Sequence, residues 1–240
     1  MNESKSQPLI IGHRGAYDEA PENTLKGFKK AIELGADYLE FDVHQSKDGA
    51  LVVIHDIDIL RRMGIDNSIV QLTLRELKQL DNGGEKIPTL TELIKIAKGK
   101  IKLQLEIKVP GVTQDLVNIL RKNVLIESSI VSCFEIVELL KIKEIEPTLR
   151  IGYLIPRVLT NIRIIKRYVL RAIKNEFYSI HPNYQVVDRE FVELAHDNSL
   201  KVNVWTVNEE RIMRKLIDLG VDGIMTDDIT LLNKLLGRSY

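Results

Sequence analysis

Short apolar runs and longer amphipathic segments alternate along this chain. The runs are rich in Ile, Val and Leu, as in buried strands, and the segments between them repeat their apolar residues at helical spacing. Beyond residue 89 the pattern predicts helices at 90–97, 113–122, 136–145, 161–175, 189–198, 209–219 and 231–236, with strands at 101–107, 129–134, 151–155, 177–180, 202–207 and 223–225. Such alternation indicates a parallel sheet with helical crossovers.

The N-terminal part adds two strands, 9–11 and 38–43, separated by a helix for which Asn23 is the expected N-cap. An Asp-Gly dipeptide at 48–49 predicts a tight turn, so residues 51–55 return antiparallel to the second strand. Without this returning arm the strands number about eight, as in a (β/α)8 TIM barrel. A doubly wound open sheet would carry a glycine-rich fingerprint after its first strand, and the sequence has none.

Residues 57–88 break the rhythm, and we interpret them as a small insertion above the barrel mouth within one domain, 1–240. Lys+Arg and Asp+Glu are equal at 34 each, which gives no reason to expect a nucleic-acid partner and leaves a small-molecule substrate. One cysteine, Cys133, excludes an intrachain disulfide. The polar N-terminal residues lack a signal-peptide pattern, and no apolar run approaches the roughly 20 residues of a membrane span. We therefore expect no transmembrane segment and a cytoplasmic location.

Charged residues follow four of the apolar runs, at Gly12-His13-Arg14-Gly15, Glu40-Phe41-Asp42, His55-Asp56 and Glu106-Ile107-Lys108. A charge at the end of a buried strand is costly unless it faces a site. Because the carboxyl ends of parallel barrel strands meet at one mouth, these four segments predict one polar site there.

Two carboxylates on one strand face, Glu40 and Asp42, predict a hard cation, with Glu106 as a plausible third ligand. Ligation by oxygen alone suits Mg²⁺ or Ca²⁺. The alternative is that these carboxylates pair with Arg or Lys side chains at the rim. If residues 48–49 are the two central turn residues, His55 faces Asp42 across the hairpin and comes close to the metal.

Two histidines beside a metal are the groups that phosphodiester hydrolysis requires, with His13 and His55 as acid and base. A lone histidine at a strand end is more often structural, but the convergence of these two favours catalysis. Arg14 could hold an anionic oxygen through two hydrogen bonds, and Lys108 adds a second cation.

Two further residues are candidates for substrate contact. His181 ends the sixth barrel strand, where it could touch the substrate. Trp205, the only Trp of the chain, ends the seventh, where it could pack against an alcohol group or act as a core or rim aromatic.

Taken together, the motifs closely resemble the glycerophosphodiester phosphodiesterase family. The matching segments are His13-Arg14-Gly15, Pro21-Glu22-Asn23-Thr24, Glu40-Phe41-Asp42-Val43, Lys47-Asp48-Gly49, Val52-Val53-Ile54-His55-Asp56, Ile87-Pro88-Thr89-Leu90, Glu106-Ile107-Lys108, Trp205-Thr206-Val207-Asn208 and Gly223-Ile224-Met225-Thr226-Asp227. They run in family order through nearly the whole chain.

The resemblance implies a (β/α)8 barrel and the metal-dependent hydrolysis of glycerophosphodiesters to glycerol phosphate and an alcohol. By this resemblance Glu40, Asp42 and Glu106 match the family's ligands of Ca²⁺ or Mg²⁺, and His13 and His55 match its acid–base pair. Arg14 and Lys108 match the phosphate contacts. Glu22 and Asn23 match residues that border the site.

The chain departs from the family pattern at 57–64, where the alcohol group would enter. A lysophospholipase D-like phosphodiesterase on the same barrel is therefore one alternative, and a non-catalytic polyol-phosphate binding protein is another. Attack on phosphorus by a glycerol hydroxyl, through a cyclic phosphate, and direct attack by water also both stay open.

Overall fold

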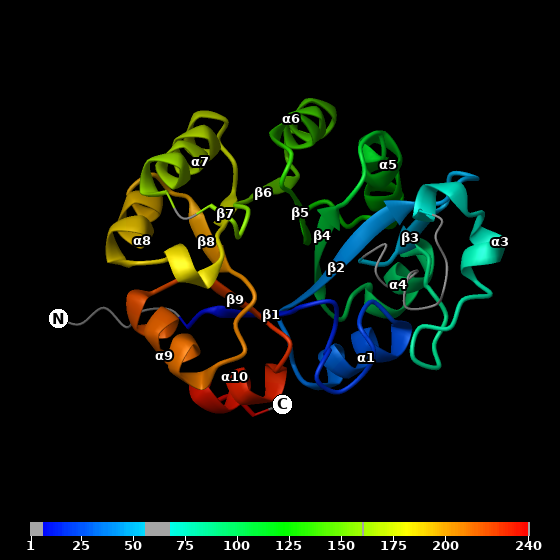
Figure 1. The fold of residues 1–240 in the computed structure, drawn as a ribbon, viewed down its shortest axis with the longest axis horizontal. Helices are drawn as coiled ribbons and strands as arrows, with labels where there is room; N and C mark the ends of the chain where they lie inside the picture. The colour runs from blue at the N-terminus through cyan, green and yellow to red at the C-terminus, as the bar shows by residue number, and fades with distance from the viewer. Residues whose placement is uncertain (1–6, 56–67, 160, 240) are drawn as a thin grey trace.

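The computed structural model describes residues 7–55, 68–159 and 161–239. Eight parallel strands form a closed barrel, because β1 pairs with β2 on one side and with β9 on the other (Figure 1). The barrel strands are β1 (Leu9–Gly12), β2 (Tyr38–Gln45), β4 (Lys102–Ile107), β5 (Ser129–Cys133), β6 (Arg150–Leu154), β7 (Ser179–His181), β8 (Lys201–Val204) and β9 (Gly223–Thr226). The predicted (β/α)8 TIM barrel is confirmed.

An outer layer of helices surrounds the barrel (Figure 1). Its members are α1 (Leu25–Glu33), α4 (Leu90–Ala97), α5 (Thr113–Asn123), α6 (Ile136–Ile145), α7 (Ile162–Lys174), α8 (Arg189–His196), α9 (Glu210–Leu219) and α10 (Ile229–Leu236). Several begin at a side-chain N-cap, among them Thr89, Asp188 and Asp228, whose oxygens accept a backbone N–H of the first turn. Between β7 and α8 lies a short 3₁₀ turn, η2 (Tyr184–Val186).

Alternation along the strands separates two buried regions. Outward-facing residues of the strands pack with the apolar faces of the helices into the main core. A smaller cluster, Ile11, Tyr38, Ile130 and Met225, lies on the other face of the strands, inside the barrel. The barrel interior near the carboxyl ends of the strands is instead polar, and there the candidate site lies.

The β2–β3 hairpin differs from its predicted register by one residue. β3 (Leu51–Val53) is antiparallel to β2, and Val43 pairs with Val53, so that Ile54 rather than His55 lies across from Asp42. The loop has three residues instead of two, since Ser46 and Ala50 still pair through a backbone hydrogen bond of 2.9 Å. Gly49 ends this loop at φ +87°, a backbone conformation suited to glycine.

Residues 68–88 form the described part of the expected insertion, and 57–67 lie outside the described residues. A 3₁₀ turn, η1 (Ile69–Gln71), and one short helix, α3 (Leu74–Leu77), pack on the hairpin. Their shared apolar cluster joins Val52 and Ile54 of the hairpin arm to Ile69, Leu77 and Ile87. This cluster anchors the arm that leads to His55.

Candidate active site

Three buried carboxylates meet at the mouth of the barrel. Asp42 and Glu106 are register partners on β2 and β4, and Glu40 lies two residues before Asp42 on the same strand face. One carboxylate oxygen from each lies within 4.8 Å of those of the other two. All three side chains are almost fully inaccessible to solvent. The chain thus brings together the three residues that the sequence predicted as metal ligands.

Arg14 and Lys108 lie against these carboxylates. The Nζ atom of Lys108 is 3.1 Å from Asp42 and also forms an ion pair with Glu106. Arg14 donates from its guanidinium to Glu22 at 2.7 Å, and its Nε lies 3.4 Å from Asp42. The carboxylates therefore do pair with cations at the rim, which was the alternative to metal ligation, but these cations do not neutralise all of their charge.

Charge counting shows why the pairing is incomplete. The ionic cluster has four carboxylates and two cations: Glu22, Glu40, Asp42, Glu106, Arg14 and Lys108. With every carboxylate ionised, two negative charges are in excess, which one divalent cation would balance. Three oxygen donors at this spacing, without sulfur or nitrogen, fit Mg²⁺ or Ca²⁺.

Burial and mutual repulsion affect the pKa values of the three carboxylates differently. Burial raises the pKa of Glu40 well above its usual range, and Asp42 and Glu106 raise it further. Burial also raises the pKa of Glu106 to about 7, although the charge of Lys108 opposes this. Burial alone would raise the pKa of Asp42, but Lys108 and Arg14 hold it well below its usual range. A cation bound here would therefore displace protons from Glu40 and Glu106.

Left-handed backbone conformations position two of the side chains. Arg14 has φ +53° and Asn23 has φ +54°, and the Asn23 N–H donates to the Arg14 carbonyl at 2.9 Å. The Arg14 backbone N–H donates to Glu40 at 2.9 Å. The Asn23 amide donates to Asp42 at 2.8 Å, and Asn23 is not the N-cap of α1, contrary to the expectation from sequence. That role belongs to Thr24, whose hydroxyl accepts from the Gly27 N–H.

His13 forms a hydrogen-bonded pair with Asp227, the residue that follows β9. The His13 Nδ1 atom lies 2.7 Å from Asp227 Oδ1, and Asn208 donates to the other carboxylate oxygen. Burial alone would raise the pKa of Asp227, but the hydrogen bond from His13 lowers it. Because an ionised carboxylate only accepts, Nδ1 of His13 donates this hydrogen bond, and Nε2 is the ring nitrogen left to face a substrate.

Sequence reasoning assigned no role to Asp227 or Asn208. Both belong to segments that match the family motifs, Gly223–Asp227 and Trp205–Asn208, and Asp227 lies two residues after the predicted strand 223–225 and directly after the observed β9. This position near a strand end is a signal that could have identified Asp227, because charged residues at the ends of other strands are candidates for the same reason.

His55 ends the arm that follows β3. Its register places it one position beyond the residue opposite Asp42, yet its charge still contributes to the low pKa of Asp42. Its carbonyl oxygen lies 3.2 Å from Nε2 of His44, a side chain whose pKa burial lowers. His55 is thus close to the carboxylate cluster, although it does not pair directly across from Asp42 as the predicted register required.

His181 does not lie at the mouth. Its side chain is fully buried inside the barrel, 2.8 Å from the Ser179 hydroxyl, and burial lowers its pKa to about 3. The ring occupies the space left by Gly152, where an added Cβ would lie 2.5 Å from the imidazole. In this structure His181 offers no surface to a substrate, contrary to the sequence-based expectation.

Trp205 lies beyond the end of β8, close to the cluster. Its indole N–H donates to the His181 carbonyl at 2.8 Å, and its ring packs edge-to-face on Phe134 at 5.9 Å between centroids. Lys108 lies over the same Phe134 ring, 6.0 Å from its centroid. Trp205 is partly exposed and is therefore an aromatic residue of the rim. Phe134 lies between it and Lys108 of the ionic cluster.

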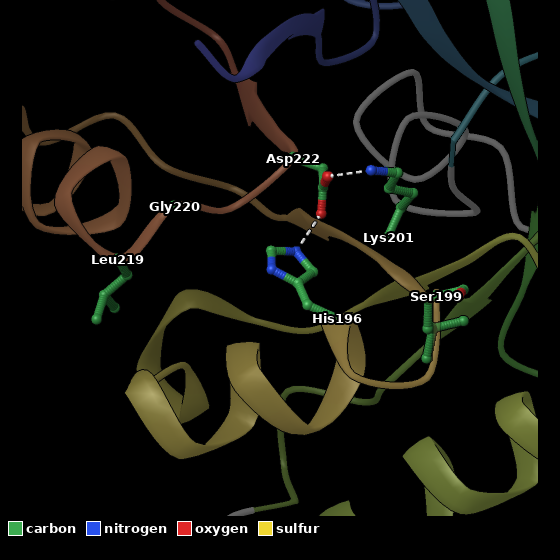
Figure 2. A pocket seen from close by; sticks show the side chains of 7 residues that line it. His196, Ser199, Lys201, Leu219, Gly220 and Asp222 are labelled. Carbon is green, nitrogen blue, oxygen red and sulfur yellow. Dashed lines mark hydrogen bonds and ion pairs between the residues drawn. The ribbon is translucent and has the colours of Figure 1, made fainter. Parts of the chain in front are cut away.

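A second histidine–aspartate pair lines a pocket at the opposite end of the barrel (Figure 2). His196 Nε2 lies 2.7 Å from Asp222 Oδ2, and Lys201 pairs with the other oxygen at 2.9 Å. Lys201 begins β8 and Asp222 precedes β9, which places this pocket at the amino ends of the strands. In barrel enzymes that end serves stability rather than catalysis.

The fold and the ionic mouth together define a barrel enzyme, and comparison with known proteins gives its family. Residues 13–231 match the model of the glycerophosphoryl diester phosphodiesterase family. A glycerophosphodiester phosphodiesterase from Caldanaerobacter subterraneus is 38% identical over 234 residues, covering 92% of this chain and 94% of that protein. The chain therefore belongs to the glycerophosphoryl diester phosphodiesterase family and is an enzyme that hydrolyses phosphodiesters.

Solved structures agree with this assignment. The glycerophosphodiester phosphodiesterase from Thermotoga maritima superposes with a TM-score of 0.82 at 35% identity, over 96% of this chain and 99% of that one. A phosphodiesterase from Oleispira antarctica, solved in complex with the product sn-glycerol-3-phosphate, has a TM-score of 0.85 at 28% identity, over 96% and 97%. Among the described helices, none is long and apolar enough to span a membrane.

Proposed function

We propose that this chain hydrolyses a glycerophosphodiester to glycerol phosphate and an alcohol, with Mg²⁺ or Ca²⁺ held by Glu40, Asp42 and Glu106. The observation that carries the proposal is the carboxylate cluster beside the oriented His13–Asp227 pair. A related phosphodiesterase binds sn-glycerol-3-phosphate as its product, which supports the glycerol side of the substrate. A divalent cation held there would polarise the phosphoryl oxygens and neutralise charge in the transition state.

The two histidines divide the proton transfers between them in this proposal. Asp227 fixes the His13 tautomer, so Nε2 of His13 can accept the proton of the attacking hydroxyl. His55 then donates a proton to the leaving alcohol oxygen as the P–O bond breaks. The same division serves attack by water and attack by a glycerol hydroxyl through a cyclic phosphate.

The remaining side chains hold the phosphate and each other. Arg14 and Lys108 contact the phosphate oxygens and balance the charge that develops on them. Glu22 orients the Arg14 guanidinium, and Asn23 holds Asp42. Trp205 packs against the alcohol group, whereas His181 supports the Trp205 indole through its backbone carbonyl.

Two broader features complete the proposal. The whole chain is one barrel domain, with the insertion at 57–88 bordering the mouth. The second is a cytoplasmic location, with which the one buried cysteine, Cys133, is compatible because it needs no disulfide partner; burial raises its pKa to about 11.

The test is turnover of several glycerophosphodiesters in a coupled assay for glycerol phosphate, with wild type and the His13→Ala and His55→Ala variants. We expect release of glycerol phosphate by the wild type and a loss on the order of 10²–10⁴-fold in each variant. Wild-type turnover of none of these diesters would overturn the proposed substrate class. Full activity of both variants would overturn the acid–base assignment.

A further inference from the structure

The region around α7 has a charge unlike that of the rest of this neutral chain. Residues 147–175 contain no Asp or Glu. Six cations occur in the loop before α7 and in the helix itself: Arg157, Arg163, Lys166, Arg167, Arg171 and Lys174. Basic residues therefore accumulate on one segment of a protein whose 34 cations and 34 acids otherwise balance.

The outer face of α7 mixes these cations with apolar side chains. The inner face is anchored, since Ile165, Val169 and Ala172 are fully buried in the barrel core. On the outside, Leu170 of α7 is 57% exposed, and Val158, in the loop before the helix, is 85% exposed. With Ile164, they account for three of the eight large apolar side chains that are exposed in the described part of the chain. An exposed apolar set among cations is typical of an interfacial helix.

Most of the cations also lack acidic partners. Lys166 pairs with Glu190 at 2.5 Å. Within residues 7–55, 68–159 and 161–239, no carboxylate forms an ion pair with Arg157, Arg163, Arg167 or Lys174, and all four side chains are exposed. Their charge is therefore available to an external anionic surface.

The position of this segment relates it to the active site. α7 follows the loop that leaves the carboxyl end of β6, so Arg157, Val158 and the first turn of α7 lie at the mouth end of the outer layer. In the ring of helices α7 lies between α6 and α8, on the other side of the barrel from α1 (Figure 1). A surface that bound this face would lie beside the mouth without covering the site between β1, β2 and β4.

We propose that this face of α7, with the loop before it, docks the enzyme on an anionic membrane surface. The cations are attracted to the negative charge of such a surface, and the exposed apolar side chains enter the boundary between headgroups and acyl chains. A nucleic acid would use the cations but has no acyl-chain region for the exposed Val158 and Leu170 to enter. The docking is independent of the hydrolytic reaction, and it holds the mouth next to lipid headgroups.

Vesicle co-sedimentation of the full chain tests this. The probes are vesicles of phosphatidylcholine alone and of phosphatidylcholine with phosphatidylserine. We expect the wild type to bind only the anionic vesicles and to dissociate at high salt. The Arg163→Glu/Arg167→Glu variant should lose at least about tenfold in apparent affinity, because two attractive charges become repulsive.

A matched control comes from α9, which exposes cations together with acids. The Arg211→Glu/Lys215→Glu variant makes the same charge change on a face that also carries Glu210 and Asp218, and it should bind nearly as well as the wild type. Equal losses in the α7 and α9 variants would overturn the proposal, as would absence of wild-type binding to anionic vesicles.

Two further measurements separate the competing explanations. The Val158→Ser/Leu170→Ser variant should bind anionic vesicles more weakly than the wild type, and unchanged binding would refute the interfacial mode. Binding of a labelled oligonucleotide in preference to the vesicles would overturn the proposal in favour of a nucleic-acid surface. Turnover of a water-soluble diester should be unchanged in all these variants, so a failure to dock is distinguishable from a failure to hydrolyse.

Discussion

β9 carries a histidine–aspartate pair at each of its ends. Asp227 follows the strand and lies 2.7 Å from His13, and Asp222 precedes it and lies 2.7 Å from His196. By distance the two pairs are indistinguishable. The first belongs to the proposed catalytic site, and the second lines a surface pocket (Figure 2).

The difference lies in what surrounds each aspartate. At the amino end, Asp222 also pairs with Lys201 and accepts the Val202 N–H at 2.8 Å, so it ties the starts of two strands together. The His196 side chain there is 38% exposed, compared with 16% for His13. At the carboxyl end, strands converge on a buried excess of negative charge. A His–Asp pair therefore indicates a catalytic site only when the barrel also places other buried charges beside it.

The largest expected effect is that of metal removal, which acts at the mouth alone. Exhaustive chelation should lower turnover by at least about 10³-fold, since polarisation of the phosphoryl oxygens contributes several kcal/mol. Added Mg²⁺ or Ca²⁺ should restore it, both in the wild type and in a His196→Ala control. Turnover that survives complete removal of metal would contradict ligation by Glu40, Asp42 and Glu106.

The next effect is that of removing His13. His13→Ala should lower kcat on the order of 10²–10⁴-fold and delete one limb of a bell-shaped pH–rate profile. A diester with a nitrophenolate leaving group needs no proton from the enzyme, so it should rescue His55→Ala and not His13→Ala. Circular dichroism checks that the barrel is intact. Equal losses with good and poor leaving groups in both variants would refute the division into base and acid.

Metal-free stability should depend on pH through the mouth carboxylates. The pKa of Glu106, about 7 in the folded chain against an ordinary value of 4.5, means that the folded state binds the proton more tightly. The free energy of unfolding should therefore fall as pH rises from 4.5 to 7, by up to about 3 kcal/mol, and level off above. Glu40 acts in the same direction.

Chemical denaturation of chelated protein between pH 5.5 and 7.5 measures this slope. Glu106→Gln should flatten it, whereas Asp222→Asn, at the other end of β9, should leave it unchanged. Divalent cation at pH 7.5 should restore stability to the wild type. If the free energy of unfolding of the metal-free protein increased through this pH range, the pKa values of the mouth carboxylates would not be raised in the folded state.

The strand ends were predictable from sequence because burial and charge conflict there. A carboxylate at the end of an apolar run indicates a polar site, because a charge buried elsewhere would be costly. Parallel topology then brings Glu40, Asp42 and Glu106 to the same mouth. The alternation of helices and strands from residue 90 was predictable for a similar reason, since helical and strand periodicities differ clearly.

The hairpin register and the location of His181 depended on information that local sequence lacks. Asp-Gly suits a two-residue turn and also a three-residue loop with glycine in the left-handed region, and Gly49 adopts the second. His181 ends its strand, but its depth is set by pairing with Leu154 and by the space over Gly152. Asn23 and Thr24 are both good caps, and only the hydrogen bond to Asp42 decides between them.

Asp227→Asn tests whether the carboxylate at the mouth orients His13. The amide could donate to the imidazole and favour the wrong tautomer, so we expect kcat to fall about 10–100-fold, as for other groups that orient a catalytic side chain. The pH–rate limb assigned to His13 should move, because the imidazolium loses its negative partner. An unchanged limb with a lower melting temperature would indicate that Asp227 is structural, like Asp222.

The smallest effect should come from His196→Ala, at the amino end of β9. We expect kcat/KM to stay within about twofold of the wild type, because the pocket that holds this pair lies at the amino ends of the strands and the ionic mouth lies at their carboxyl ends. Since the pair is partly exposed, its loss should cost no more than about 1 kcal/mol of stability. Asp222 keeps its contacts with Lys201 and the Val202 N–H in this variant, so the strand ends stay joined. A tenfold loss of kcat/KM with an unchanged melting temperature would show that the two ends of β9 are coupled. It would also show that a His–Asp pair can affect catalysis without lying at the carboxyl end of the strand.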